Sequence, residues 1–234
     1  MRGVQLVSFL VLFSFLAACS GQQQTARSLP EKGDPSFFKV RDSYADEVYL
    51  NEDITKAGWL DAVRRIYLAP ASMSTTQIVQ PHGVRESDLD AWELTDDEER
   101  VLQAKFVQAM TVALERDNAF YVVADKADAQ VVLYPRVISV HPYQPRSVAA
   151  AGGKGGGAVT MSFTLVDPSD DKVLAQILDS KSTDDIWAFD NMDDGKTALD
   201  LIFSAWGNQI WRSLLFLQGR LDATPLPLQV KEQG

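Results

Sequence analysis

The chain contains a single cysteine, Cys19, and its position constrains the fold more than any other feature of the sequence. The apolar run over residues 4–16 precedes it. This run is shorter than the roughly 20 apolar residues that span a bilayer, and with Arg2 before it, it is typical of a secretory signal. One cysteine excludes an internal disulfide and a thiolate metal cluster. A hydrophobic core must therefore hold the folded part together.

The residues around Cys19 predict a lipid anchor. Leu16, Ala17, Ala18 and Cys19 resemble the lipobox of bacterial lipoproteins, in which the cysteine thiol receives diacylglycerol and the chain is cut before it. We expect a signal peptide over 1–18 and acylation at Cys19, where two or more acyl chains give stable anchoring. Ser20, in place of Asp, indicates the outer membrane of a Gram-negative bacterium, on its periplasmic face. The alternative is a plain secretory signal in which the cysteine is accidental.

The charge of the chain excludes two classes of partner, and its local composition separates a tether, a domain and a tail. The 234 residues include 22 Lys and Arg against 32 Asp and Glu, a net charge of −10. This balance argues against binding to nucleic acid and against a polybasic grip on anionic lipid. Residues 19–36 are polar and predict a flexible tether. A single domain is expected over 37–220, with its core from about residue 58, and a flexible tail over 221–234.

Hydrophobic periodicity predicts an α+β domain. A capping box at Thr95 and Glu98 begins a helix that extends to about Arg116, and a second helix starts at Asp194 or Gly195 and stops at Gly219, with Trp206 on its core face. Pro135 implies an edge position, a bulge or a break in its strand. Residues 44–50 fit a short helix or a strand. The expected strands cover 64–70, 119–124, 129–140, 159–166 and 172–182, the last two as a hairpin.

The order β-α-β-β-β-β-α predicts a two-layer sandwich. A strand–helix–strand unit followed by hairpins gives a mixed, mostly antiparallel sheet, and two amphipathic helices suffice to cover one of its faces. A domain of about 160 residues buries enough surface to be stable without disulfides or metals.

Several segments together resemble a bacterial lipoprotein family, domain of unknown function 3313. They are LAAC at 16–19, PSFF at 35–38, RRIYLAP at 64–70, TDDEER at 95–100, the hairpin at 162–182 and ALDLIFSAWGNQIWRSL at 198–214. The resemblance implies an envelope lipoprotein with an α+β domain. It transfers no activity and no active-site residue.

Three partial motifs lack the residues that their chemistry needs. Residues 193–197 end like a phosphate-binding loop but carry Asp190 where the first glycine belongs. Residues 190–201 begin like a calcium loop but place Leu201 at the position of the bidentate glutamate. Ser169 and Lys172 have the spacing of penicillin-binding enzymes without their companion motifs. We therefore predict no catalytic residue, no metal site and no cofactor.

The favoured hypothesis is a non-catalytic binding or accessory module of the cell envelope, with a protein partner. The candidate partner contacts are Gly152, Gly153, Lys154 and Gly155 in a glycine-rich loop, and Trp187 and Phe189 in an acidic loop. Acidic residues concentrate over 86–99 and 179–194. One alternative is an envelope hydrolase acting on peptidoglycan or a related polymer, with His82 or His141 beside carboxylates. Another is a structural protein that oligomerises through a sheet edge.

Overall fold

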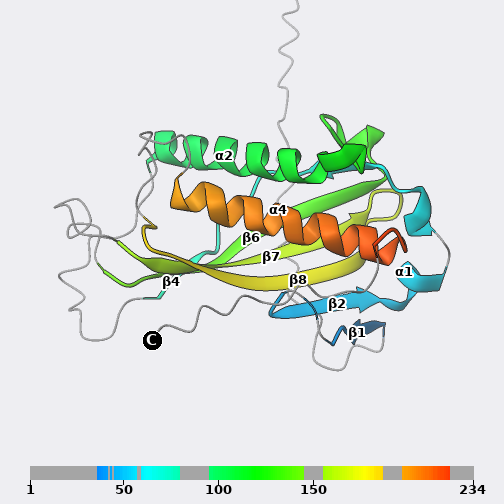
Figure 1. Cartoon of the computed structure of the whole chain (residues 1–234), viewed down its shortest axis with the longest axis horizontal. Helices are drawn as coiled ribbons and strands as arrows, with labels where there is room; N and C mark the ends of the chain where they lie inside the picture. The colour runs from blue at the N-terminus through cyan, green and yellow to red at the C-terminus, as the bar shows by residue number, and fades with distance from the viewer. Residues whose placement is uncertain are drawn as a thin grey trace, which may run out of the picture.

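A computed structural model describes residues 36–41, 43, 45–56, 59–79, 95–144, 155–186 and 197–221. In this part of the chain, one mixed sheet of eight strands carries two long helices on one side (Figure 1). The predicted α+β two-layer sandwich is confirmed. The helices are α1 Glu52–Lys56, α2 Asp96–Leu114 and α4 Ala198–Leu217. The strands are β1 Phe37–Lys39, β2 Glu47–Asn51, β3 Arg65–Leu68, β4 Gln77–Ile78, β5 Tyr121–Val123, β6 Val131–Pro142, β7 Gly157–Asp167 and β8 Lys172–Thr183.

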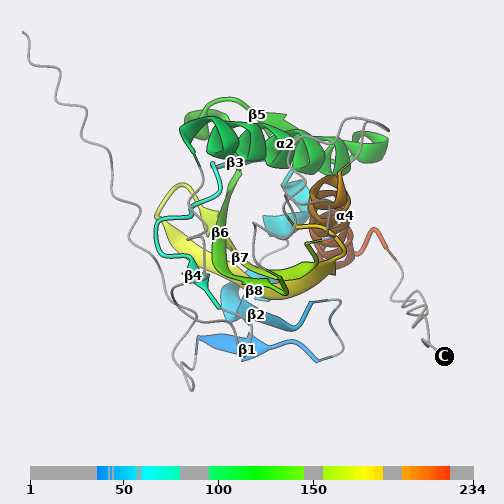
Figure 2. The ribbon, with the colours of Figure 1, turned by 90° about the vertical axis from the view of Figure 1, so that its left-hand side faces the viewer.

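The sheet is antiparallel on one side of β6 and parallel on the other. Its strand order is β1-β2-β8-β7-β6-β3-β5, with β4 paired to β6 beyond the end of β3. The β7–β8 hairpin turns at Asp171, whose φ of 55° is left-handed. Viewed along the strands, the sheet curves so that α2 and α4 lie in its hollow (Figure 2). This arrangement points the first turns of both helices toward one end of the sheet.

Both long helices start at a reciprocal cap. At α2 the predicted capping box is confirmed, because Glu98 N–H donates to Thr95 Oγ1 (3.3 Å) and Thr95 N–H donates to Glu98 Oε2 (2.9 Å). Helix α4 begins at Ala198, later than expected, because Thr197 forms the same box with Asp200. Gly219 follows the end of α4 with a left-handed φ of 63°, as its position predicted.

Pro135 lies inside the sheet, so the edge position is wrong. Strand β6 pairs with β7 on one side and with β3, Ser72 and β4 in succession on the other. The proline is tolerated because the neighbouring chain is interrupted beside it: Ser72 N–H donates to Pro135 O (3.0 Å), between the end of β3 and the start of β4. A bulge follows between Val137 and Ser139, which was one of the three expected outcomes.

The core forms between the hollow of the sheet and the two helices. Trp206, predicted to be buried, is 1% exposed, and its ring lies 6.0 Å from that of Phe163. Its Nε1–H donates to Asp179 Oδ2 (2.9 Å), and this carboxylate also pairs with Lys181. Helices α2 and α4 approach closely at Gly207, where an added Cβ would lie 2.6 Å from Ala113 Cβ. None of the helices described is long and apolar enough to cross a bilayer.

Two N-terminal strands extend the sheet beyond the predicted order. Residues 47–51 form β2, which pairs with β8 through Val48 opposite Ile177, and β1 adds to its outer edge. The strand alternative for 44–50 was therefore the right one. Strands β1 and β4 were not predicted, because three-residue and two-residue strands show no measurable alternation.

Candidate functional site

An apolar cavity lies between the sheet and the first halves of α2 and α4. Its volume is about 50 Å³, and its walls are almost entirely carbon. Helix α2 contributes Leu102 and Phe106, α4 contributes Leu199 and Phe203, and β7 contributes Val159 and Met161. The lining residues of α2 precede Ala113 and those of α4 precede Gly207, where the two helices approach each other closely.

The bases of the two predicted contact loops meet at this cavity. Ile186 N–H, at the start of the acidic loop, donates to the carbonyl of Gly155 in the glycine-rich loop (2.7 Å). Ile186 lines the cavity and is 1% exposed. Gly157 must lack a side chain there, because a Cβ would lie 2.9 Å from His141 O and 3.0 Å from Ile186 Cδ1. Part of the glycine run therefore serves close packing between the loops.

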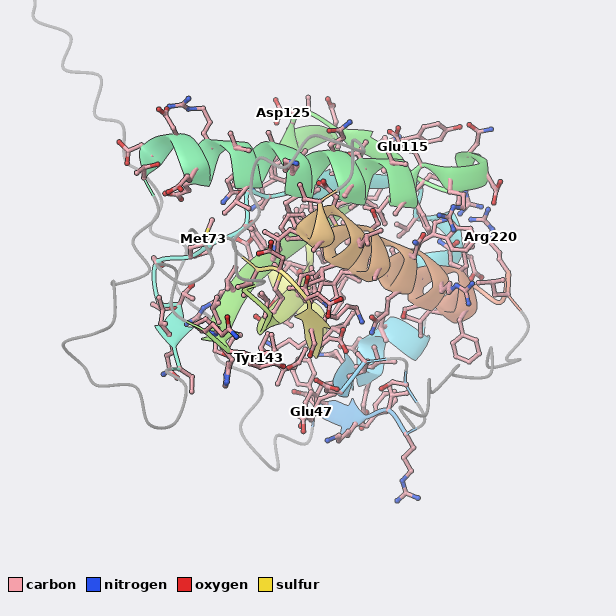
Figure 3. The ribbon with its side chains drawn as sticks, turned by 60° about the vertical axis from the view of Figure 1, so that its left-hand side comes forward. Glu47, Met73, Glu115, Asp125, Tyr143 and Arg220 are labelled. Carbon is pink, nitrogen blue, oxygen red and sulfur yellow. The ribbon has the colours of Figure 1, made fainter. Side chains whose placement is uncertain are left out.

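The chain between β3 and β4 closes the third side. Gln103 of α2 holds it in place, since its Oε1 accepts from Ala71 N–H (2.9 Å) and its Nε2–H donates to Ala71 O (2.5 Å). Ala71 and Met73 line the cavity, and a shallow groove beside it adds Ser72, Ser74 and Glu99. Met73 and Tyr143 lie toward this end of the molecule, opposite Arg220 (Figure 3).

We call this region the open end and define it as residues 69–74, 95–106, 141–143, 155–159, 184–186 and 197–203. It carries seven carboxylates, those of Asp96, Asp97, Glu98, Glu99, Asp184, Asp185 and Asp200, and two lysine or arginine side chains. Arg100 pairs with Asp97 (2.6 Å) and Lys105 with Asp200 (3.2 Å), so both cations are already engaged. The open end is therefore acidic around an apolar cavity.

Asp200 joins the two helices at the open end. Burial pushes the pKa of this carboxyl upward, but hydrogen bonds from Thr197 and the pairing with Lys105 outweigh burial and hold the pKa below its usual value. The same carboxylate therefore caps α4 and ties its first turn to α2 in the ionised form.

Most predicted site residues lie outside the described part of the chain. These are Leu16, Ala17, Ala18, Cys19, Gly152, Gly153, Lys154, Trp187, Phe189 and His82. Gly155 is described, and its carbonyl is bonded at the loop base. His141 is half-buried, and the partner of its Nε2 is Ser139 Oγ (3.2 Å). Within the described residues no group of His, Cys, Asp and Glu side chains could hold a metal ion.

Sequence reasoning found the two loops but missed the cavity. Its walls come from six separate segments of the chain, and the sequence of each segment is typical of an ordinary hydrophobic core. Two signals pointed to it: the glycines that directly precede β7, and Ala71, a small residue placed after Pro70 where a strand stops.

Comparisons with known proteins give structural neighbours only. No family model matches the chain, and no curated protein matches it. A Xanthomonas campestris protein of family DUF330 superposes with a TM-score of 0.40 at 13% identity, covering 68% of this chain and 90% of that one. The PelC dodecamer protein of Paraburkholderia phytofirmans gives 0.32 at 12% identity, covering 66% and 88%. Lipoprotein GNA1162 of Neisseria meningitidis gives 0.33 at 14% identity, covering 64% and 99%. The resemblance to domain of unknown function 3313 stays a prediction.

Proposed function

We propose that the protein is a lipoprotein of the bacterial outer membrane that faces the periplasm and acts as a non-catalytic binding module, with the open end as its binding surface. The observation that carries the binding role is that the glycine-rich loop and the acidic loop join by the hydrogen bond from Ile186 N–H to Gly155 O, and that Ile186 lines an apolar cavity. Ligand sites are commonly concave, apolar and rimmed by a few polar groups.

The lipobox Leu16–Ala17–Ala18–Cys19 supports the location. Acylation at Cys19 followed by the polar stretch up to Ser36 would leave the folded part tethered to the membrane. The test of the anchor is metabolic labelling with a palmitate analogue in cells that express the full-length chain. Wild type is expected to label and to fractionate with the outer membrane, and Cys19→Ala to lose both properties. Unchanged labelling of the variant would contradict the anchor.

The binding surface is tested by site-specific photocrosslinking in the same cells. We expect a discrete crosslinked product from a photoreactive residue at Met73 or Asp184, both at the open end. The matched positions Asp61 and Arg220 at the opposite end are exposed and should give none. Equal crosslinking from both ends would show that the open end has no special role.

A further inference from the structure

The size of the cavity restricts what can enter it. A pocket of about 50 Å³ is far smaller than the roughly 300–1,000 Å³ of typical small-molecule sites, and smaller than the roughly 150 Å³ apolar cavity that holds benzene. It fits the tip of one aliphatic side chain. Gln103, the polar residue in its wall, directs its amide to the backbone of Ala71, so the wall offers no free polar group to a ligand head.

The charge around the mouth restricts what can carry that side chain. Glu99 lines the groove that continues from the cavity, and Asp96 and Asp97 precede it in the exposed first turn of α2. Asp184 is exposed next to Ile186 on the opposite rim. The two cations at this end are paired with Asp97 and Asp200. Among the described residues of the open end, seven carboxylates stand against two cations, so an approaching segment meets net negative charge, which favours a basic segment and repels an acidic one.

The same two properties argue against the other occupants. A lipid acyl chain is much longer than this cavity, the groove that continues from the cavity is lined by the polar residues Ser72, Ser74 and Glu99, and the anionic headgroups of bacterial lipids would meet the acidic rim. A second copy of this chain would bring an identical acidic end, and each copy carries a net charge of −10.

We propose that the open end binds an extended, basic segment of a partner protein and that the cavity receives one aliphatic side chain of that segment. This inference rests on the proposed binding role of the open end and names the chemistry of the partner. Burying one aliphatic side chain provides affinity, and the flanking Lys or Arg residues provide orientation and speed of association through Glu99 and Asp184.

The test uses the full-length protein in phosphatidylcholine vesicles and the peptide Lys-Lys-Leu-Lys-Lys, fluorescently labelled at its C-terminus, with protein-free vesicles as background. Binding is followed by fluorescence anisotropy up to millimolar protein. Ala71→Leu fills the cavity and is expected to weaken binding about tenfold. Met73→Trp enlarges a half-buried side chain that lines both the cavity and the groove beside it, and should act in the same direction. Ala124→Leu makes the same change at an exposed position outside the open end and should leave binding unchanged.

Charge is tested separately from the cavity. Glu99→Lys should weaken binding several-fold, whereas Asp61→Lys, at the other end of the molecule, should not change it. A peptide with Ala in place of Leu should bind about tenfold less well, and one with Glu in place of Lys should not bind.

The proposal is overturned if no peptide binds, if the Glu-flanked peptide binds equally well, or if Ala71→Leu and Ala124→Leu behave alike. Displacement of the peptide by laurate would identify an acyl chain as the occupant and would also overturn it. These results leave the photocrosslinking and labelling outcomes untouched, so failure of the partner chemistry is distinguishable from failure of the proposed function.

Discussion

The two ends of the sandwich are built by different means. At the open end the chain segments surround an apolar cavity, where Asp200 ties α4 to α2 through Lys105 and Gln103 holds Ala71. At the opposite end, which we call the closed end (residues 59–65, 114–130 and 214–221), neutral amide side chains bond directly to the backbone. Gln218 Nε2–H donates to Leu60 O (2.6 Å) and to Val63 O (3.0 Å).

A second glutamine repeats this pattern at the closed end. Gln130 Oε1 accepts from the backbone N–H groups of Arg64 (2.9 Å) and Arg65 (3.0 Å), and its Nε2–H donates to Ala62 O (3.1 Å). Arg220 adds a hydrogen bond to Gln218 Oε1 and a cation–π contact with Phe120. Glutamine side chains satisfy backbone groups at both ends, with two such residues at the closed end and Gln103 at the open end, but the open end also retains free volume and net negative charge for a ligand.

The largest loss of stability is expected from Gln218→Ala, which removes the side-chain amide that ties α4 to the backbone at the closed end. The variant loses four hydrogen bonds, two to the carbonyls of Leu60 and Val63 and two from Arg64 and Arg220, and the free energy of unfolding should fall by about 3 kcal/mol. The measurement is urea denaturation followed by circular dichroism. Gln103→Ala is the matched change at the open end, where water can replace the lost bonds to Ala71, and should cost about 1 kcal/mol. Equal losses would erase the distinction between the two ends.

The second test compares the free volume at the two ends by making the same substitution, Ala to Leu, at each of them. Ala119, at the closed end, is 1% exposed, and Ala119→Leu should lower the free energy of unfolding by about 2–3 kcal/mol through overpacking. Ala71→Leu places the same extra atoms in the cavity and should change stability by less than about 1 kcal/mol. Thermal denaturation of the two variants provides the measurement. A large loss for Ala71→Leu would mean that the cavity cannot accept an aliphatic group.

The same contrast explains how far the sequence predicted the structure. The long elements were predictable, because Thr95 with Glu98 marks a helix start and the 159–182 region alternates over two adjoining strands. These signals are local. The glutamine ties were not predictable, since Gln218 and Leu60 are distant in the chain, and nothing near Gln218 indicates its partner.

The candidate site also has parts that local sequence signals predict and a part that they do not. The glycine-rich and acidic loops are visible as composition, and their meeting through Gly155 and Ile186 follows from the pairing of β7 between β6 and β8. The cavity depends on how α2 and α4 pack on the sheet and on each other, and the two helices approach closely at Gly207 and Ala113. A glycine in a helix does not reveal which neighbour it admits.

The smallest loss of stability is expected from Asp200→Asn. This loss should depend on pH, because Asp200 at the open end titrates. The variant keeps a side chain that can cap α4 but loses the negative charge near Lys105 and the helix N-terminus, at a cost of about 1 kcal/mol at pH 7. Because folding lowers the pKa of Asp200, its contribution is fully present above the ordinary value of 3.8 and is lost as the pH falls through the folded value.

The stability that Asp200 provides should therefore decrease toward low pH, and the decrease should be located at the first turn of α4. Wild type should be more stable than Asp200→Asn at pH 7, and the two should converge once the pH has fallen below the lowered pKa of Asp200, where both side chains are uncharged. Amide hydrogen exchange locates the effect: in wild type, acid should lower protection in the first turn of α4 before it lowers protection near Gln218, whose amide does not titrate. If both ends of α4 lost protection together, the helix would respond as one unit, and the carboxylate ties would not distinguish the open end from the closed one.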